Sequence, residues 1–227
     1  MTFASARRRL RASLVKSAGT IVFGMEDGTV SIFGLIFGVA ATTDSTGTVV
    51  IAGATGAVAA AVSMMAGVYL DAETTRDAQA ADRAAVLASD AASLPGELAA
   101  AGLTPEQSAA LSKAVAHDAT AVRGLLLALH HSPDAPESPW TQALWMLAAD
   151  FAAAAVPILP FVWLPVAQAR VVSGVVTLLL LVGLGVGRAR VAKRDTLRTV
   201  LETVAIGIAA ALAGVLIGIL VNRGFGG

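Results

Sequence analysis

Five long apolar segments constrain the fold of this chain more than any other feature. They cover about residues 18–42, 48–70, 141–164, 169–187 and 199–221, and each is long enough to cross a bilayer as a helix. Apolar runs of this length without alternation favour helices over strands. Only 14% of the residues are charged, against about 25% in a soluble domain, so little polar surface is available to cover buried helices. We therefore predict an all-α, polytopic membrane protein with five transmembrane helices.

Positively charged residues predict the orientation of these helices. All but two of the 16 Lys and Arg residues lie before the first segment, between the second and third, or between the fourth and fifth; the exceptions are Arg170 and Arg223. We expect the amino terminus in the cytoplasm and the carboxyl terminus outside, and composition favours a bacterial plasma membrane. The chain has no cysteine, which excludes disulfides and thiolate metal ligands. Its net charge of zero gives no indication of nucleic-acid binding.

The polar stretches divide the chain into four parts. Residues 1–19 form a basic cytoplasmic segment, either an amphipathic helix on the anionic leaflet or a disordered arm that only follows the charge rule. Residues 18–70 hold the first two membrane helices, and residues 141–221 hold the last three. Residues 71–140 are polar, rich in Ala and interrupted by five prolines. They predict a cytoplasmic insertion of two or three helices, the first continuous with the second span, with Thr104 as the N-cap of a later one.

Carboxylates inside the apolar segments are the first candidate functional residues. Asp27 and its neighbour Glu26 lie in the first segment, where a buried charge costs roughly 2.5 to 3.5 kcal/mol on insertion scales. Charges at membrane depth usually face a bundle interior, a water-filled cavity or a bound cation, which predicts an ion or proton pathway. Asp27 and Asp150 each lie about nine residues, or roughly 13 Å, from a cytoplasmic helix end, so they can share a site. Glu26 is equally compatible with a role at the interface.

Thioether and imidazole groups are the other possible metal ligands. Met64 and Met65 lie near the cytoplasmic end of the second segment. Methionine is usually a packing residue, but with Asp27 in the preceding helix the pair suggests a carboxylate and thioether site for a late first-row divalent metal. A second cluster comprises His130, His131, Asp134 and Glu137. We interpret it as ordinary surface, because neighbouring residues diverge round a helix and cannot easily share one metal.

Four stretches of the sequence resemble the vacuolar iron transporter family. They read DGTVSIFGLIFGVA, AGATGAVAAAVSMMAGVYLDAETTRD, VPILPF and LETVAIGIAAALAGVLIGILV, and they match that family in order and spacing. The resemblance implies a five-helix homodimer without a cofactor that moves Fe2+, and often Mn2+, out of the cytosol in exchange for protons. It also implies that Asp27 and Met64 line the path between protomers. Residues 71–140 occupy the place of a helical domain that collects metal ions.

The chain departs from the family pattern at several positions. Gly56 stands where many members have Glu, and Val68 stands where bacterial relatives often have Glu. The Glu pairs expected in the cytoplasmic helices are largely missing. These departures are compatible with weak metal collection, altered selectivity or loss of transport.

Together these features predict a proton-coupled antiporter that exports a divalent metal, Fe2+ or Mn2+. Its candidate metal ligands are Asp27, Met64, Glu26, Asp150 and Met65. One alternative is a non-transporting, dimeric membrane interaction module of the same fold. Another is an exporter of a small cationic solute, although only 5% of the residues are aromatic and none form an evident lining. No nucleophile elbow, phosphate loop, zinc-protease motif or dinucleotide fingerprint is present in the sequence, so nothing predicts an enzyme.

Overall fold

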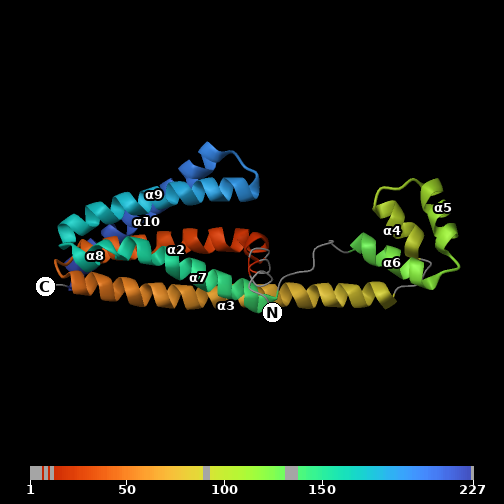
Figure 1. The fold of residues 1–227 in the computed structure, drawn as a ribbon, viewed down its shortest axis with the longest axis horizontal. Helices are drawn as coiled ribbons and strands as arrows, with labels where there is room; N and C mark the ends of the chain where they lie inside the picture. The colour runs from red at the N-terminus through yellow and green to blue at the C-terminus, as the bar shows by residue number, and fades with distance from the viewer. Residues whose placement is uncertain (1–6, 8–9, 11–12, 89–92, 131–137, 226–227) are drawn as a thin grey trace. The chain divides into compact units, whose positions relative to one another are not determined.

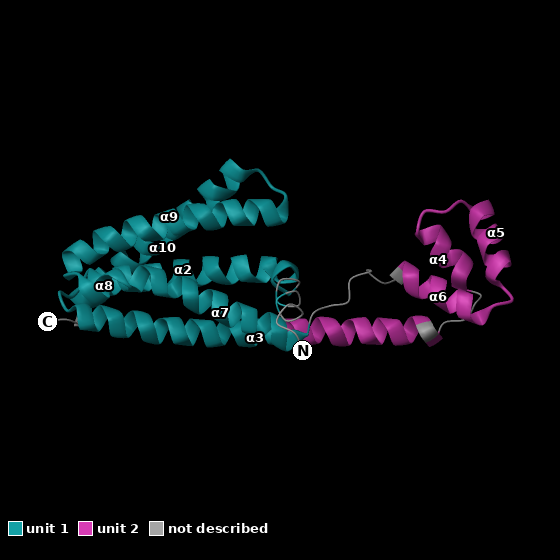
Figure 2. Ribbon diagram, viewed as in Figure 1, with its two compact units in different colours: residues 1–70, 137–227 teal, residues 71–136 magenta. Residues whose placement is uncertain are grey.

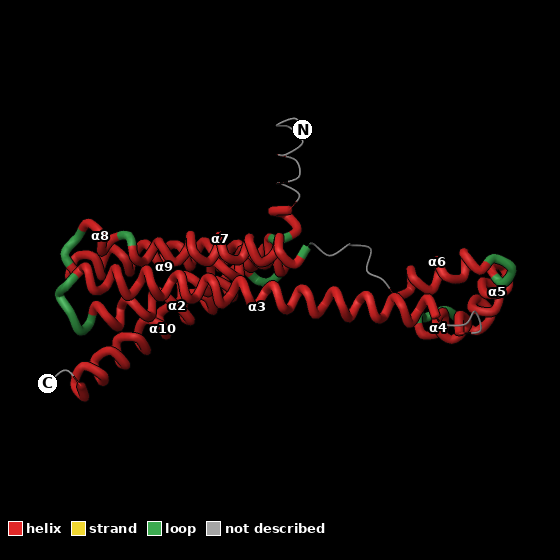
Figure 3. The backbone as a smooth tube through the Cα atoms, turned by 90° about the horizontal axis from the view of Figure 1, so that it is seen from below, coloured by secondary structure: helices red, strands yellow, loops and turns green. Residues whose placement is uncertain are grey.

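The computed structural model describes the chain except for residues 1–6, 8–9, 11–12, 89–92, 131–137 and 226–227. Its regular structure in the described part is helical, without strands (Figure 3), which confirms the predicted all-α fold. Five helices are long and apolar enough to cross a membrane. They are α2 (Ala18–Ala40), α3 (Thr46–Ala88), α7 (Pro139–Ile158), α9 (Val166–Ala192) and α10 (Thr196–Phe225).

The third membrane helix ends earlier than predicted. The expected segment 141–164 is divided, because α7 ends at Ile158 and a short helix, α8 (Pro160–Trp163), follows it. Proline has no backbone N–H and its ring clashes with the carbonyl four residues earlier. Pro157 in the last turn of α7 and Pro160 at the start of α8 therefore remove two helical hydrogen bonds within four residues. The apolar run predicted the membrane segment correctly, but the prolines determine where its helix stops.

The described residues form two compact units (Figure 2). Residues 1–70 and 137–227 make up the first unit, and residues 71–136 make up the second. Helix α3 continues without interruption past residue 70, as expected for a second span that runs on into the insertion. Part of the predicted basic segment 1–19 lies outside the described residues, although residues 13–16 are helical.

The second unit contains more helices than the two or three expected. Beyond the end of α3 it has α4 (Leu94–Ala100), α5 (Pro105–Val115) and α6 (Ala119–His130). Thr104 caps α5 as predicted: its side chain accepts a hydrogen bond from Gln107 N at 3.3 Å, and Gln107 Oε1 accepts one from Thr104 N at 3.0 Å. Asp118 accepts hydrogen bonds from the first turn of α6, which separates that helix from α5. The apolar core of the unit consists of Val86, Leu94, Leu98, Val122 and Leu126.

Helix α2 lies at the centre of the first unit and packs against α7, α9 and α10 (Figure 1). Its contact with α10 is unusually close, because glycines face each other across it. A Cβ atom on Gly38 would lie only 2.6 Å from the carbonyl oxygen of Gly214, and one on Gly34 would lie 2.9 Å from that of Ala210. Such small residues let two helix backbones approach in a membrane. The glycine spacing therefore fixes α10 against one half of α2.

A short turn joins α9 to α10. Helix α9 ends at Ala192 and α10 begins at Thr196, so only residues 193–195 separate them. Lys193 closes α9 in the left-handed conformation, with φ of 52°, and Arg194 N donates a hydrogen bond to Ala189 O at 3.0 Å. Because the turn is short, side chains near the end of α9 and the start of α10 lie at a similar depth in the bundle.

Candidate functional site

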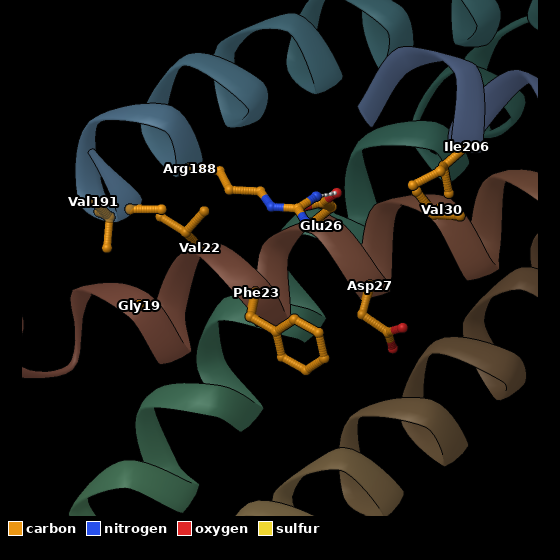
Figure 4. A pocket seen from close by; sticks show the side chains of 10 residues that line it. Gly19, Val22, Phe23, Glu26, Asp27, Val30, Arg188, Val191 and Ile206 are labelled. Atoms are coloured by element: carbon orange, nitrogen blue, oxygen red, sulfur yellow. Dashed lines mark hydrogen bonds and ion pairs between the residues drawn. The ribbon is translucent and has the colours of Figure 1, made fainter. Parts of the chain in front are cut away.

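Two adjacent acidic residues on α2 point in different directions. Glu26 faces α9, where its Oε1 atom accepts a hydrogen bond from Arg188 Nη1 at 2.9 Å and another from Thr203 Oγ1 at 3.1 Å. Figure 4 shows the Asp27 carboxylate pointing in a different direction, away from Arg188. Adjacent residues are about 100° apart round a helix, which explains the divergence. The sequence pair therefore provides two different groups, one neutralised by a cation and one free.

A cavity of about 440 Å³ lies beside these residues. Its walls come from α2, the end of α9 and one residue of α10 (Figure 4). The lining residues are Gly19, Val22, Phe23, Glu26, Asp27, Val30, Arg188, Val191, Ala192 and Ile206. Most of this lining is aliphatic, so the charged groups are the polar features that a ligand would meet.

Asp27 is the unpaired acid of this cavity. Its side chain is only partly exposed. Within the described residues, its carboxylate makes no hydrogen bond and no ion pair. A carboxylate held at membrane depth without a protein partner is expected to face an ion or proton pathway. The structure thus places Asp27 in the wall of a cavity, without a hydrogen-bonding or ionic partner among the described residues.

Asp150 on α7 is a second acid without a partner. It is 0% exposed, and neither carboxyl oxygen has a hydrogen-bond partner among the described residues. A Cβ atom on Gly28 would lie 2.7 Å from Asp150 Oδ1, so this carboxyl group packs directly against the backbone of α2, one residue from Asp27. Buried polar groups are normally hydrogen-bonded, and exceptions call for a ligand, a proton or water. The expectation that Asp27 and Asp150 lie at similar depth is consistent with this contact.

The two methionines lie on α3, outside the residues that line the cavity. Met64 and Met65 are both partly exposed. Helix α3 runs antiparallel to α2 and contacts it where a Cβ atom on Gly56 would meet the Leu35 side chain. Met64 lies eight residues after Gly56, and Asp27 lies eight residues before Leu35. Because the rise per residue is the same in both helices, Met64 is level with Asp27 in the bundle.

The other clusters are less informative. Residues 131–137, which include three members of the His130, His131, Asp134 and Glu137 group, lie outside the described residues. Among the residues that the structure does describe, no three His, Cys, Asp or Glu side chains form a ready-made metal site.

Sequence reasoning missed Arg188 and Thr203. Arg188 was counted among basic residues beyond the fourth span, but α9 continues to Ala192 and places it within the helix. Its contact with Glu26 joins residues 162 positions apart in the sequence, and Thr203 lies 177 positions from Glu26. The sequence offered one indication of this contact: a buried carboxylate such as Glu26 usually needs a cationic partner.

Comparison with protein-family models identifies a family that covers most of the chain. A family model described as the VIT family matches residues 18–219 of the chain. The matched region runs from the first residue of α2 into α10 and contains Asp27, Met64 and Asp150. No match was found among curated proteins.

Proposed function

Because the chain belongs to the VIT family, a family of membrane transporters of metal ions, we propose that it exports Fe2+ or Mn2+ from the cytoplasm in exchange for protons. The observation that carries this proposal is the free carboxylate of Asp27 beside a cavity of about 440 Å³. A charged group in such surroundings is costly unless a cation visits it.

Asp27 is the central metal ligand in this proposal. Asp150 supplies a second carboxyl group next to it, and Met64 supplies a thioether at the same level of the bundle. A thioether favours late first-row metals over Mg2+ and Ca2+, which prefer oxygen ligands. Glu26 and Met65 are further candidates; Glu26 shares one oxygen with Arg188 and Thr203.

Competition between a metal ion and protons for the same carboxylates would couple the two fluxes. In apolar surroundings a carboxylate is stabilised by binding a cation or by accepting a proton, and it cannot do both at once. Release of the metal on the far side of the membrane would therefore be favoured by protonation there. This scheme needs no cofactor, only the side chains of α2 and α7.

The proposed arrangement places the amino terminus in the cytoplasm and the carboxyl terminus outside, in a homodimer within the plasma membrane. The uneven distribution of Lys and Arg supports the orientation. Support for a second copy comes from the family resemblance described above. The span of α10 is only 6% buried within the chain, against 44% for α2, which leaves its surface available to lipid or to another protomer.

Transport assays on reconstituted protein test the proposal. Proteoliposomes with an imposed pH gradient are expected to accumulate Mn2+, and the Asp27→Asn variant is expected to lose this uptake. Asp44→Asn is the matched control, because Asp44 is exposed and lies outside the helices. Uptake that persists in Asp27→Asn, or that is equally lost in Asp44→Asn, would contradict the role given to Asp27. Uptake independent of the pH gradient would contradict proton exchange.

A further inference from the structure

The ion pair between Arg188 and Glu26 forms one wall of the cavity described above. Building on the proposed function, we propose that Arg188 determines the metal affinity of this site by cancelling the charge of Glu26. Asp27 is then left as the single uncompensated charge among the lining residues. The ion is therefore held weakly enough to be released.

The geometry shows that Glu26 is engaged rather than free. Arg188 Nη1 and Thr203 Oγ1 both donate to Glu26 Oε1, at 2.9 Å and 3.1 Å. The Glu26 side chain is only 12% exposed, so the attraction is less screened than in a surface pair. Charge-assisted hydrogen bonds of this length are among the stronger ones in proteins. The contact therefore holds Glu26 toward α9 and α10, while the Asp27 carboxylate points about 100° away round α2, into the same cavity (Figure 4).

The charges that line the cavity explain why this matters. Its charged lining residues are Glu26, Asp27 and Arg188. With Arg188 present, the two acids and one base leave a single negative charge in the lining; without it, the Glu26 carboxylate would also attract the ion, in addition to Asp27 and to Asp150 behind the lining. A divalent cation binds more tightly as the number of nearby carboxylates increases. Transport requires binding that is strong enough for the ion to enter and weak enough for it to leave.

A cycle of two single variants and their combination tests this role, with Mn2+ binding to the purified full-length protein measured by calorimetry. Arg188→Gln should tighten Mn2+ binding about tenfold, because it frees a negative charge beside Asp27. Glu26→Gln should weaken it by about the same factor, because it leaves the guanidinium unpaired. The double variant should return to the wild-type affinity.

Other roles for Glu26 and Arg188 predict different results. If Glu26 binds the metal directly, the double variant stays as weak as Glu26→Gln. If the pair only stabilises the bundle, the melting temperature changes while the affinities of all three variants remain equal. Either result overturns the proposal.

Controls separate this inference from the proposed function. Arg190→Gln removes a charge from an exposed position on the same helix and should not change the affinity. Arg188→Lys keeps the charge and should stay within about threefold of wild type. If Arg188→Gln does not fold, the comparison of Glu26→Gln with the double variant decides: restored affinity supports the proposal, and unrestored affinity overturns it. Equal Mn2+ binding by wild type and Asp27→Asn would instead refute the site itself.

Discussion

The two halves of α2 meet their neighbours in opposite ways. The first half carries Glu26 and Asp27 beside a cavity of about 440 Å³ that contains charged groups from two helices. The second half carries Gly34 and Gly38, whose backbone touches α10 directly. A groove of about 520 Å³ runs along this contact, but no charged residue lines it. Both halves of α2 border a hollow, but charged side chains line only the one beside the first half, whereas close glycine contacts hold the second half against α10.

The comparison predicts that changes in and around the first half of α2 affect transport more than stability. Asp150 on α7 belongs to this region, because it packs against Gly28. Asp150→Asn keeps the shape of a side chain that is 0% exposed but removes its charge. We expect Mn2+ uptake to fall roughly 10- to 100-fold, as for other groups that support a metal site. The melting temperature should not fall, because the variant no longer buries an unpaired carboxylate. Uptake and thermal melting can be measured on the same preparations.

The control for this change is Asp44→Asn, at an exposed position outside the helices. Wild-type uptake by Asp150→Asn would remove Asp150 from the pathway. A large loss of stability would show that Asp150 has a structural role instead. In both cases the contrast between the halves of α2 would weaken.

In the second half of α2, the expected effect is on stability. Gly38→Ala would place a Cβ atom 2.6 Å from Gly214 O, so α10 would have to move away. We expect the free energy of unfolding to fall by about 1 to 3 kcal/mol, as in other overpacked contacts. Thermal unfolding in detergent, with CD as the readout, measures this loss.

Gly183→Ala is the matched control for the glycine contact. A Cβ atom at Gly183 on α9 would meet no described atom within 4 Å, and alanine is the better helix former. This variant should therefore be at least as stable as the wild type. Equal stability of Gly38→Ala and Gly183→Ala would show that close backbone contact does not hold α10.

The smallest expected effect concerns the hydroxyl group of Thr203. Thr203→Val removes one of the two hydrogen bonds to Glu26 Oε1 and leaves Arg188 in place. A net hydrogen bond is worth about 1 kcal/mol, so Mn2+ binding should become tighter by about fivefold at most. Thr199→Val is the control, because Thr199 Oγ1 donates to Asp195 O rather than to Glu26. Calorimetric titration distinguishes these variants. If Thr203→Val changed the Mn2+ affinity more than Arg188→Gln does, the conclusion that Arg188 is the more important donor to Glu26 would be wrong.

Apolar length was enough to predict the five membrane helices, because it reflects a property of each segment by itself. The end of the third helix was predicted wrongly, since hydrophobicity continues beyond Ile158 while Pro160 interrupts the helix. The insertion also holds more helices than expected, because the capping role of Asp118 was not recognised. Local backbone chemistry, rather than composition, accounts for both differences.

Predicting the site was harder, because its contacts join distant parts of the chain. Depth in the membrane suggested that Asp27 and Asp150 could be neighbours, and Gly28 is where α2 and α7 come close enough for this. Depth could not show which acid is paired. Glu26 and Asp27 look alike in the sequence, and only the position of Arg188 on the extended end of α9 distinguishes them.

The short turn between α9 and α10 links the two donors of Glu26 mechanically. Arg188 precedes the turn and Thr203 follows it, so both donors belong to one helical hairpin joined by residues 193–195. A displacement of the whole hairpin from α2 would lengthen both hydrogen bonds together. The charge of Glu26 would then be less compensated, and the potential at Asp27 would become more negative.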